Sequence, residues 1–108
     1  MQSERGRVIV LAPRGRLDMA SAPAFREQVK QVIESGASRR LVVDLGEVSF
    51  VDSTGLGAVI GGLRVARQAG GDLRVARANR QVLLVLDLTS LNRVLRPYSS
   101  VEAAVAAF

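Results

Sequence analysis

Apolar residues along this chain follow two patterns: short runs rich in β-branched residues, and longer stretches with helical spacing. The segments RVIVLA at 7–12, RGRLD at 14–18 and RRLVVDL at 39–45 have the length of strands, and Pro13 separates the first two. The third is continuously apolar after its two arginines, which is typical of an interior strand buried on both faces. We therefore expect two tightly joined strands, followed later by a central strand.

Between these runs, apolar residues recur every three or four positions in three longer segments, which predicts helices. These segments are bounded by residues that favour helix ends: Ser21 and Gly36, Ser53 and Gly70, Asn79 and Leu88. Residues 73–76 and RVLRPY at 93–98 have strand character. A serine cap at Ser99 or Ser100 then begins an alanine-rich terminal helix.

This alternation of strands and helices predicts an α/β sandwich, with a mixed sheet of four to five strands and about four helices. With 108 residues and 48% hydrophobic content, the chain can build one core and not two, so 1–108 is expected to be a single domain. The N-terminal MQSERGRVIV holds no apolar stretch of signal length, and no later run approaches the ~20 residues of a membrane span. We therefore expect a cytoplasmic protein.

Composition narrows the chemistry, because the chain has neither cysteine nor histidine. Disulfides, thiolate nucleophiles, Ser-His-Asp catalysis and nearly all zinc sites are thereby excluded, and we expect no cofactor, metal or catalytic residue. The net charge of +5 and the pI of about 11.2 invite a nucleic-acid interpretation. However, the arginines are scattered and aromatic residues make up only 4%, so we expect neither a nucleic-acid nor a membrane partner.

The stretch FVDSTGLG at 50–57 carries the candidate chemistry. One hydroxyl before a helix is usually a cap whose oxygen accepts a backbone N–H, but a single cap does not explain Asp52, Ser53 and Thr54 in succession. A helix N-terminus also carries partial positive charge, which favours an attached phosphate by about 0.3–1 kcal/mol in exposed positions. This surplus of polar side chains indicates a functional site.

Glycines 55, 57 and 61 spell GLGAVIG, which is close to a dinucleotide-binding fingerprint. The spacing does not fit GxGxxG, because the third glycine comes one residue late, and the next acidic residue, Asp72, precedes the following strand. These glycines are better explained by close packing of a helix on the sheet.

At this point the residues resemble a known family. The segment LVVDLGEVSFVDSTGLGAVIGGLRVARQAGG, preceded by GRLD at 15–18, is similar to the STAS domain of bacterial anti-sigma factor antagonists. That family carries a G-[E/R]-[L/I]-D turn after its second strand and a D-S-[S/T]-G-L-G segment at the start of its second helix. The similarity continues more weakly through LDLTSLNRVLRPYSSVEAAVAAF and so covers nearly the whole chain.

The resemblance implies a partner switch. The unmodified domain would bind an anti-sigma factor that is also a serine kinase, a sigma factor would be released, and phosphorylation of Ser53 would end the binding until a phosphatase reverses it. The resemblance also implies these partner-binding residues: Asp18, Asp52, Thr54, Gly55, Leu56 and Gly57. Because GRLD ends a strand, we expect Asp18 on the same side of the fold as the helix that begins at Ser53.

Three other functions remain open at this stage. The chain could be a non-switching STAS docking or scaffold subunit, as in a lipid-transport or stressosome-like assembly. It could be a small enzyme using Asp18 and Asp52 as a carboxylate pair with Ser53, or a nucleic-acid binder. For the leading hypothesis, scattered arginines are expected to border the partner site and steer an acidic partner: Arg14, Arg16, Arg39, Arg64 and Arg67.

Overall fold

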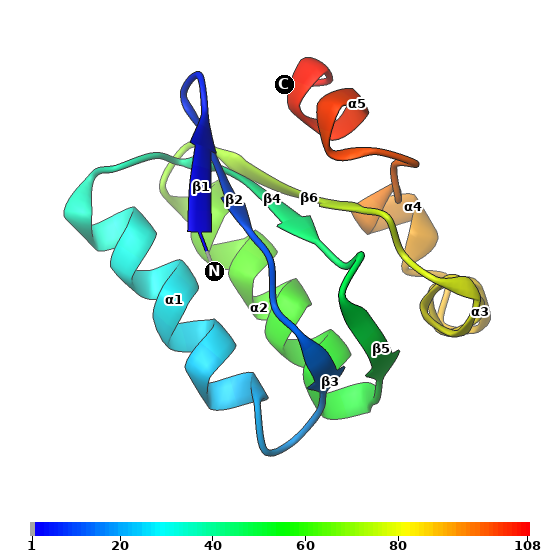
Figure 1. The fold of residues 1–108 in the computed structure, drawn as a ribbon. Helices are drawn as coiled ribbons and strands as arrows, with labels where there is room; N and C mark the ends of the chain where they lie inside the picture. The colour runs from blue at the N-terminus through cyan, green and yellow to red at the C-terminus, as the bar shows by residue number, and fades with distance from the viewer. Residues whose placement is uncertain (1) are drawn as a thin grey trace.

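Two long helices lie side by side over one face of a mixed sheet in the computed structural model, which describes residues 2–108 (Figure 1). The sheet has four strands in the order β1-β2-β4-β6, in which β1 is antiparallel to β2 and the other neighbours are parallel. Their bounds are β1 Gln2–Arg5, β2 Val8–Leu11, β4 Arg40–Asp44 and β6 Asp72–Ala76. The expected mixed sheet is confirmed.

A second, two-stranded parallel sheet continues two of these strands. It consists of β3 (Gly15–Leu17), which follows β2, and β5 (Val48–Val51), which follows β4. The expected tightly joined pair of N-terminal strands is thus present as β2 and β3. β2 and β3 pair with different neighbours. β3 and β5 continue the direction of β2 and β4, the strands that precede them in the chain.

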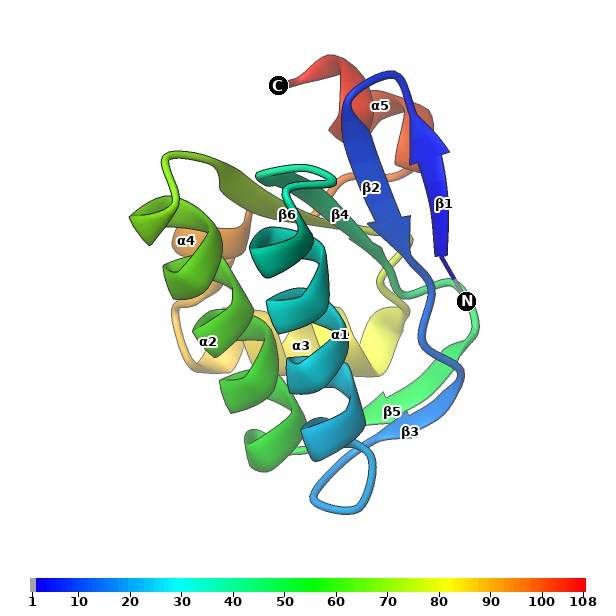
Figure 2. The ribbon, with the colours of Figure 1, turned by 90° about the vertical axis from the view of Figure 1, so that its left-hand side faces the viewer.

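Helices cover both faces of the larger sheet. On one face lie α1 (Ala22–Ser35) and α2 (Ser53–Gln68), whose apolar residues form the main core with inward-facing residues of the strands (Figure 2). On the other face α5 (Val101–Ala106) buries Val101 and Ala104 in a smaller apolar cluster. The helix α3 (Arg80–Leu88) packs against β5. Burial on both sides explains the continuous apolar run of β4.

The expected last strand at 93–98 is wrong for most of its length. Residues Asn92–Leu95 form a short helix, α4, and only Tyr98 makes a single parallel bridge, with Ala76. The reason is that Leu91 and Leu95, four residues apart, lie on the same face of a helical turn. The amide of Leu95 donates to the carbonyl of Leu91 (2.9 Å), and this turn brings the Leu95 side chain into the core. The expected cap at Ser100 is confirmed, since its hydroxyl accepts from the amide of Ala103 (3.0 Å).

The strand β1 had no signal in the sequence. Its four residues, QSER, are all exposed, so no apolar alternation marks it. It is held by its backbone pairing with β2 across a turn in which Gly6 has φ 63°. That left-handed conformation suits glycine, which has no Cβ.

Candidate functional site

The candidate site lies where β3 and β5 end together. Leu17 is the partner of Val51 in their parallel register, so Asp18 and Asp52 leave the small sheet side by side. The amide of Asp52 also donates to the carbonyl of Leu17 (3.3 Å). The expectation that Asp18 lies on the side of the α2 N-terminus is therefore confirmed, and Figure 2 shows α2 beginning directly after β5 and beside the end of β3.

The cap of α2 is Asp52. Its backbone is extended, its Oδ1 accepts from the amide of Gly55 (2.8 Å) and its carbonyl accepts from the amide of Leu56 (2.9 Å). Ser53 is the first helical residue, and it is exposed. Its hydroxyl makes no hydrogen bond to any of residues 2–108, while Thr54 beside it is half-buried. Because the side chain of Asp52 supplies the N-cap hydrogen bond of α2, the Ser53 hydroxyl is not used as a cap.

The three residues after Thr54 differ sharply in exposure. A Cβ on Gly55 would lie 1.9 Å from the carbonyl oxygen of Leu17, so only glycine allows α2 to begin this close to β3. Leu56 is 6% exposed and belongs to the main core. Gly57 is exposed, with open space where a Cβ would stand. Gly55 and Leu56 therefore hold the start of α2 against β3 and the core. Gly57 lies on the surface one helical turn after Ser53.

Asp18 holds the turn between β3 and α1. Its Oδ1 accepts from the amides of Ala20 (3.0 Å) and Ser21 (3.3 Å), and Oδ2 lies 3.5 Å from Nε of Arg16. These contacts, led by the Ser21 amide, keep the pKa of the Asp18 carboxyl below its usual value, against a smaller opposing effect of burial. Asp18 is thus ionised at neutral pH and shapes the loop beside Ser53.

Ser21 stands at the expected start of α1, but its side chain does not cap the helix. Its hydroxyl donates to the carbonyl of Arg16 (2.7 Å) and accepts from the amide of Asp18 (3.0 Å), and it makes no cap bond to the helix. It ties the turn between β3 and α1 together. The aspartate and the serine therefore act as one unit.

Arginines are distributed unevenly around this site. Arg16 is on β3, where its guanidinium lies 4.4 Å from the ring centroid of Phe50 on β5. Arg14 directly precedes β3. Arg64 and Arg67 are in the last turns of α2, more than about 15 Å along the helix from Ser53, and Arg39 precedes β4 at the far end of the strands. Arg39, Arg64 and Arg67 therefore lie away from the candidate site around Ser53.

Gln81, which the sequence did not single out, and Asn79 fix the strand that leads into the site. The side-chain amide of Gln81 both donates to the carbonyl of Val51 (2.9 Å) and accepts from its amide (3.0 Å). Asn79, the expected N-cap of α3, accepts from the amide of Val82 and donates to the carbonyls of Val48 and Ser49. In the sequence, the only sign of this role of Gln81 was an amide side chain just inside the third helix. Through these bonds α3 holds β5 in place.

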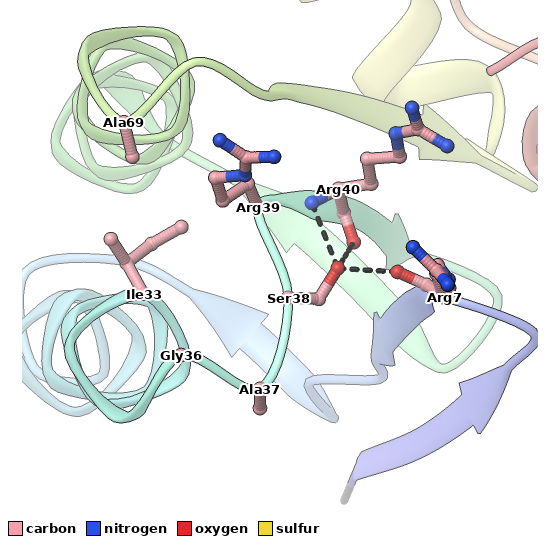
Figure 3. A pocket seen from close by; sticks show the side chains of 8 residues that line it. All are labelled: Arg7, Ile33, Gly36, Ala37, Ser38, Arg39, Arg40 and Ala69. Carbon is pink, nitrogen blue, oxygen red and sulfur yellow. Dashed lines mark hydrogen bonds between the residues drawn. The ribbon is translucent and has the colours of Figure 1, made fainter.

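One cavity lies away from Ser53, at the opposite end of the strands. It encloses about 560 Å³ and is lined by arginines 7, 39 and 40 and by small residues at the C-terminal ends of α1 and α2. Figure 3 shows that the three arginine side chains diverge, with Arg39 directed towards Ala69 and the other two away from it. The Ser38 hydroxyl instead ties the backbone of Arg7 to that of Arg40. The three arginines that line this cavity therefore do not direct their charges at one point.

Further features bear on the other functions considered. Within residues 2–108 no group of three or more acidic side chains is placed to hold a metal ion, and no helix there combines the length and apolarity needed to cross a bilayer. Gly55, Gly57 and Gly61 all lie inside α2, so GLGAVIG does not form a phosphate-binding loop. The carboxylates of Asp18 and Asp52 are both engaged by backbone amides. The lowered pKa of Asp18 makes that carboxylate a poor general base near neutral pH.

Comparison with known proteins agrees with this geometry. The family model described as "STAS domain" matches residues 2–104. The anti-sigma-B factor antagonist of Bacillus subtilis (strain 168) is 32% identical over 91 residues, which cover 84% of this chain and 82% of that protein. The anti-sigma F factor antagonist of Paenibacillus polymyxa is 29% identical over 93% of this chain and 85% of that protein. A crystal structure of a putative anti-sigma factor antagonist from Thermotoga maritima superposes with a TM-score of 0.91 at 25% identity, covering 99% of this chain and 92% of that one.

Proposed function

Because this chain belongs to the STAS domain family, we propose that it acts in the cytoplasm as an anti-sigma factor antagonist switched off by phosphorylation of Ser53. In the unmodified state it binds an anti-sigma factor that is also a serine kinase, so that a sigma factor is released. A phosphatase restores the binding form. The domain is the 1–108 unit, and it works by binding and not by catalysis.

The observation that carries this proposal is the free, exposed hydroxyl of Ser53 at the first position of α2. Because Asp52 caps the helix, modification of Ser53 breaks no hydrogen bond of the fold. A phosphate adds about −1.5 to −2 charges at a helix N-terminus, where the backbone favours an anion. The domain therefore stays folded when modified, and the new charge acts on the partner surface.

The surface around Ser53 suits a partner. Ser53 and Gly57 are exposed on successive turns of α2, and the pair of Arg16 and Phe50 lies at the strands that lead into the site. Arg16 is held by the ring and by Asp18, so it loses little freedom on binding. An anionic phosphate placed inside such a contact without a counter-charge costs about 3–5 kcal/mol, which is several hundred-fold or more in affinity.

The test compares two variants at Ser53 with a control at Thr54. Ser53→Ala should fold with a change in stability within about 0.5 kcal/mol, because its hydroxyl makes no bond in the fold, and should bind the cognate anti-sigma factor constitutively. Ser53→Asp should fold but bind at least about a hundred-fold more weakly. Thr54→Ala should still be phosphorylated on Ser53, as wild type is.

Mass spectrometry after incubation with kinase and ATP should show a gain of about 80 Da on Ser53. If the phosphate appears on Thr54 or nowhere, or if Ser53→Asp binds as tightly as Ser53→Ala, the switch is refuted. A non-switching docking subunit then becomes the better account.

A further inference from the structure

A second charged site lies at the other pole of α2 from Ser53. A cavity of about 170 Å³ opens between the last turn of α2, the start of β6 and α4. In Figure 2 α4 lies behind the C-terminal part of α2, and the start of α2 lies at the opposite end of the molecule. The charged residues lining this cavity are Arg67, Arg74, Arg93, Arg96 and Asp72. We call this set the α4 pocket.

The α4 pocket is lined by more positive than negative side chains. Four arginines and one aspartate line it, and the single carboxylate is shared: Nε of Arg67 lies 3.3 Å from Oδ1 of Asp72, and Nη2 of Arg74 lies 3.7 Å from Oδ2. Arg93 and Arg96 form no ion pair within residues 2–108. The partial negative charge at the end of α2, about half an elementary charge, is too small to offset the excess.

Arg74 is the most buried of the four. Its side chain is only 20% exposed and stacks on the ring of Phe108, with its central carbon 4.0 Å from the ring centroid. Its Nη1 is buried and makes no hydrogen bond within the described residues. A partly desolvated guanidinium with one long ion pair interacts more strongly with a nearby anion than a solvated one does.

Arg96 is held at the pocket by an unusual backbone. It ends α4 with φ 44°, a left-handed conformation that costs free energy for a residue with a Cβ. Its amide donates to the carbonyl of Asn92 (3.0 Å), and Pro97 follows. This strained turn leaves the arginine lining the cavity together with Arg93 from the same short helix.

We propose that the α4 pocket binds a small, multiply charged oxyanion of the phosphate type. A volume of 170 Å³ equals that of about five or six water molecules at ~30 Å³ each, enough for a phosphate or diphosphate group. Guanidinium groups match phosphate oxygens with paired hydrogen bonds. The site is independent of the Ser53 surface, since α2 separates the two by roughly 20 Å.

The experiment titrates inorganic pyrophosphate into the full chain by calorimetry in low salt, and follows thermal unfolding in parallel. Wild type should bind and its Tm should rise, because a ligand of the folded state stabilises it. Arg93→Gln should weaken binding at least about tenfold, the usual loss for one charge-assisted hydrogen bond. The matched control Arg26→Gln, an exposed arginine on α1, and Ser53→Ala should bind as wild type does.

A second arm identifies the source of the phosphate group. Tighter binding of ADP than of pyrophosphate would assign the site to a nucleotide, and equal or weaker binding would assign it to the free ion. The proposal is overturned if pyrophosphate does not bind at 10 mM (roughly the weakest useful range), or if Arg93→Gln and Arg26→Gln bind it equally. It is also overturned if a short DNA duplex binds through Arg93 far more tightly, since the pocket would then belong to a nucleic-acid surface.

Discussion

The exposed glycine one turn after Ser53 gives the sharpest test of where the partner docks. Gly57 is inside α2, and a Cβ there would meet no atom within 4 Å, so Gly57→Ala introduces no clash in the free domain. Alanine is favoured over glycine in a helix interior by about 0.5–1 kcal/mol. A gain of 1 kcal/mol raises Tm by roughly 4–8 °C for a domain of about this size. We therefore expect the variant to be more stable than wild type.

Binding should change in the opposite direction. If the partner packs against the face that carries Ser53 and Gly57, an added methyl overpacks the contact and costs about 1–3 kcal/mol. That corresponds to roughly a five- to 150-fold rise in Kd. More stability combined with weaker binding is a signature that damage to the fold cannot produce.

Gly61 supplies the matched control. It is one turn further along α2, it too has open space where a Cβ would stand, and it lies in the groove beside α1. Gly61→Ala should gain similar stability while keeping its affinity. Urea unfolding and calorimetry with the anti-sigma factor measure the two quantities. If both variants bind as wild type does, the partner does not pack on this face and the reasoning is refuted.

Three further predictions follow from the same site. Gly55→Ala should lose about 1–3 kcal/mol or more of stability in urea unfolding, because its Cβ would meet the Leu17 carbonyl, and an unchanged midpoint would contradict this. Asp52→Ala should lose about 1 kcal/mol with its cap bond to Gly55, whereas a loss as small as that of Ser53→Ala would show that the serine caps the helix. Asp18→Asn should impair binding or phosphorylation more than it lowers Tm. Because the pKa of Asp18 is lowered in the fold, its ionised form stabilises the protein above about pH 4, and the stability difference from Asp18→Asn should shrink as pH falls through the folded pKa; a difference that does not shrink with falling pH would contradict this.

Sequence patterns predicted most of the core elements, for a physical reason. The apolar run of β4 and the helical spacing of α1, α2 and α3 reflect burial, which periodicity records directly. The strand β1 is held mainly by backbone bonds to β2 and buries none of its residues, so no apolar pattern marks it in the sequence. In 93–98, β-branched and apolar residues suggested a strand, but the pair Leu91 and Leu95 enters the core from one helical face.

The sequence indicated which residues lie at the candidate site better than it indicated what each side chain does there. The stretch around Ser53 and the nearness of Asp18 followed from where strands end, because parallel strands finish at one edge. That Asp52 and not a hydroxyl caps α2 depends on side-chain rotamers, which the sequence does not encode locally. The positions of the arginines depend on helix length and strand direction together. Only the fold separates Arg16 from Arg64 and Arg67.

The amide of Gln81 has a consequence for how any protein can recognise this domain. Val51 is the last residue of β5, and the Gln81 side chain occupies both its N–H and its C=O on the side away from β3. An unpaired strand edge at this point would invite another chain to add a strand, either in a specific complex or in an aggregate. Here a single side chain takes the place of the missing neighbour. Strand addition beside Ser53 is therefore blocked, and a partner must select the domain by the shape and charge of its helix face.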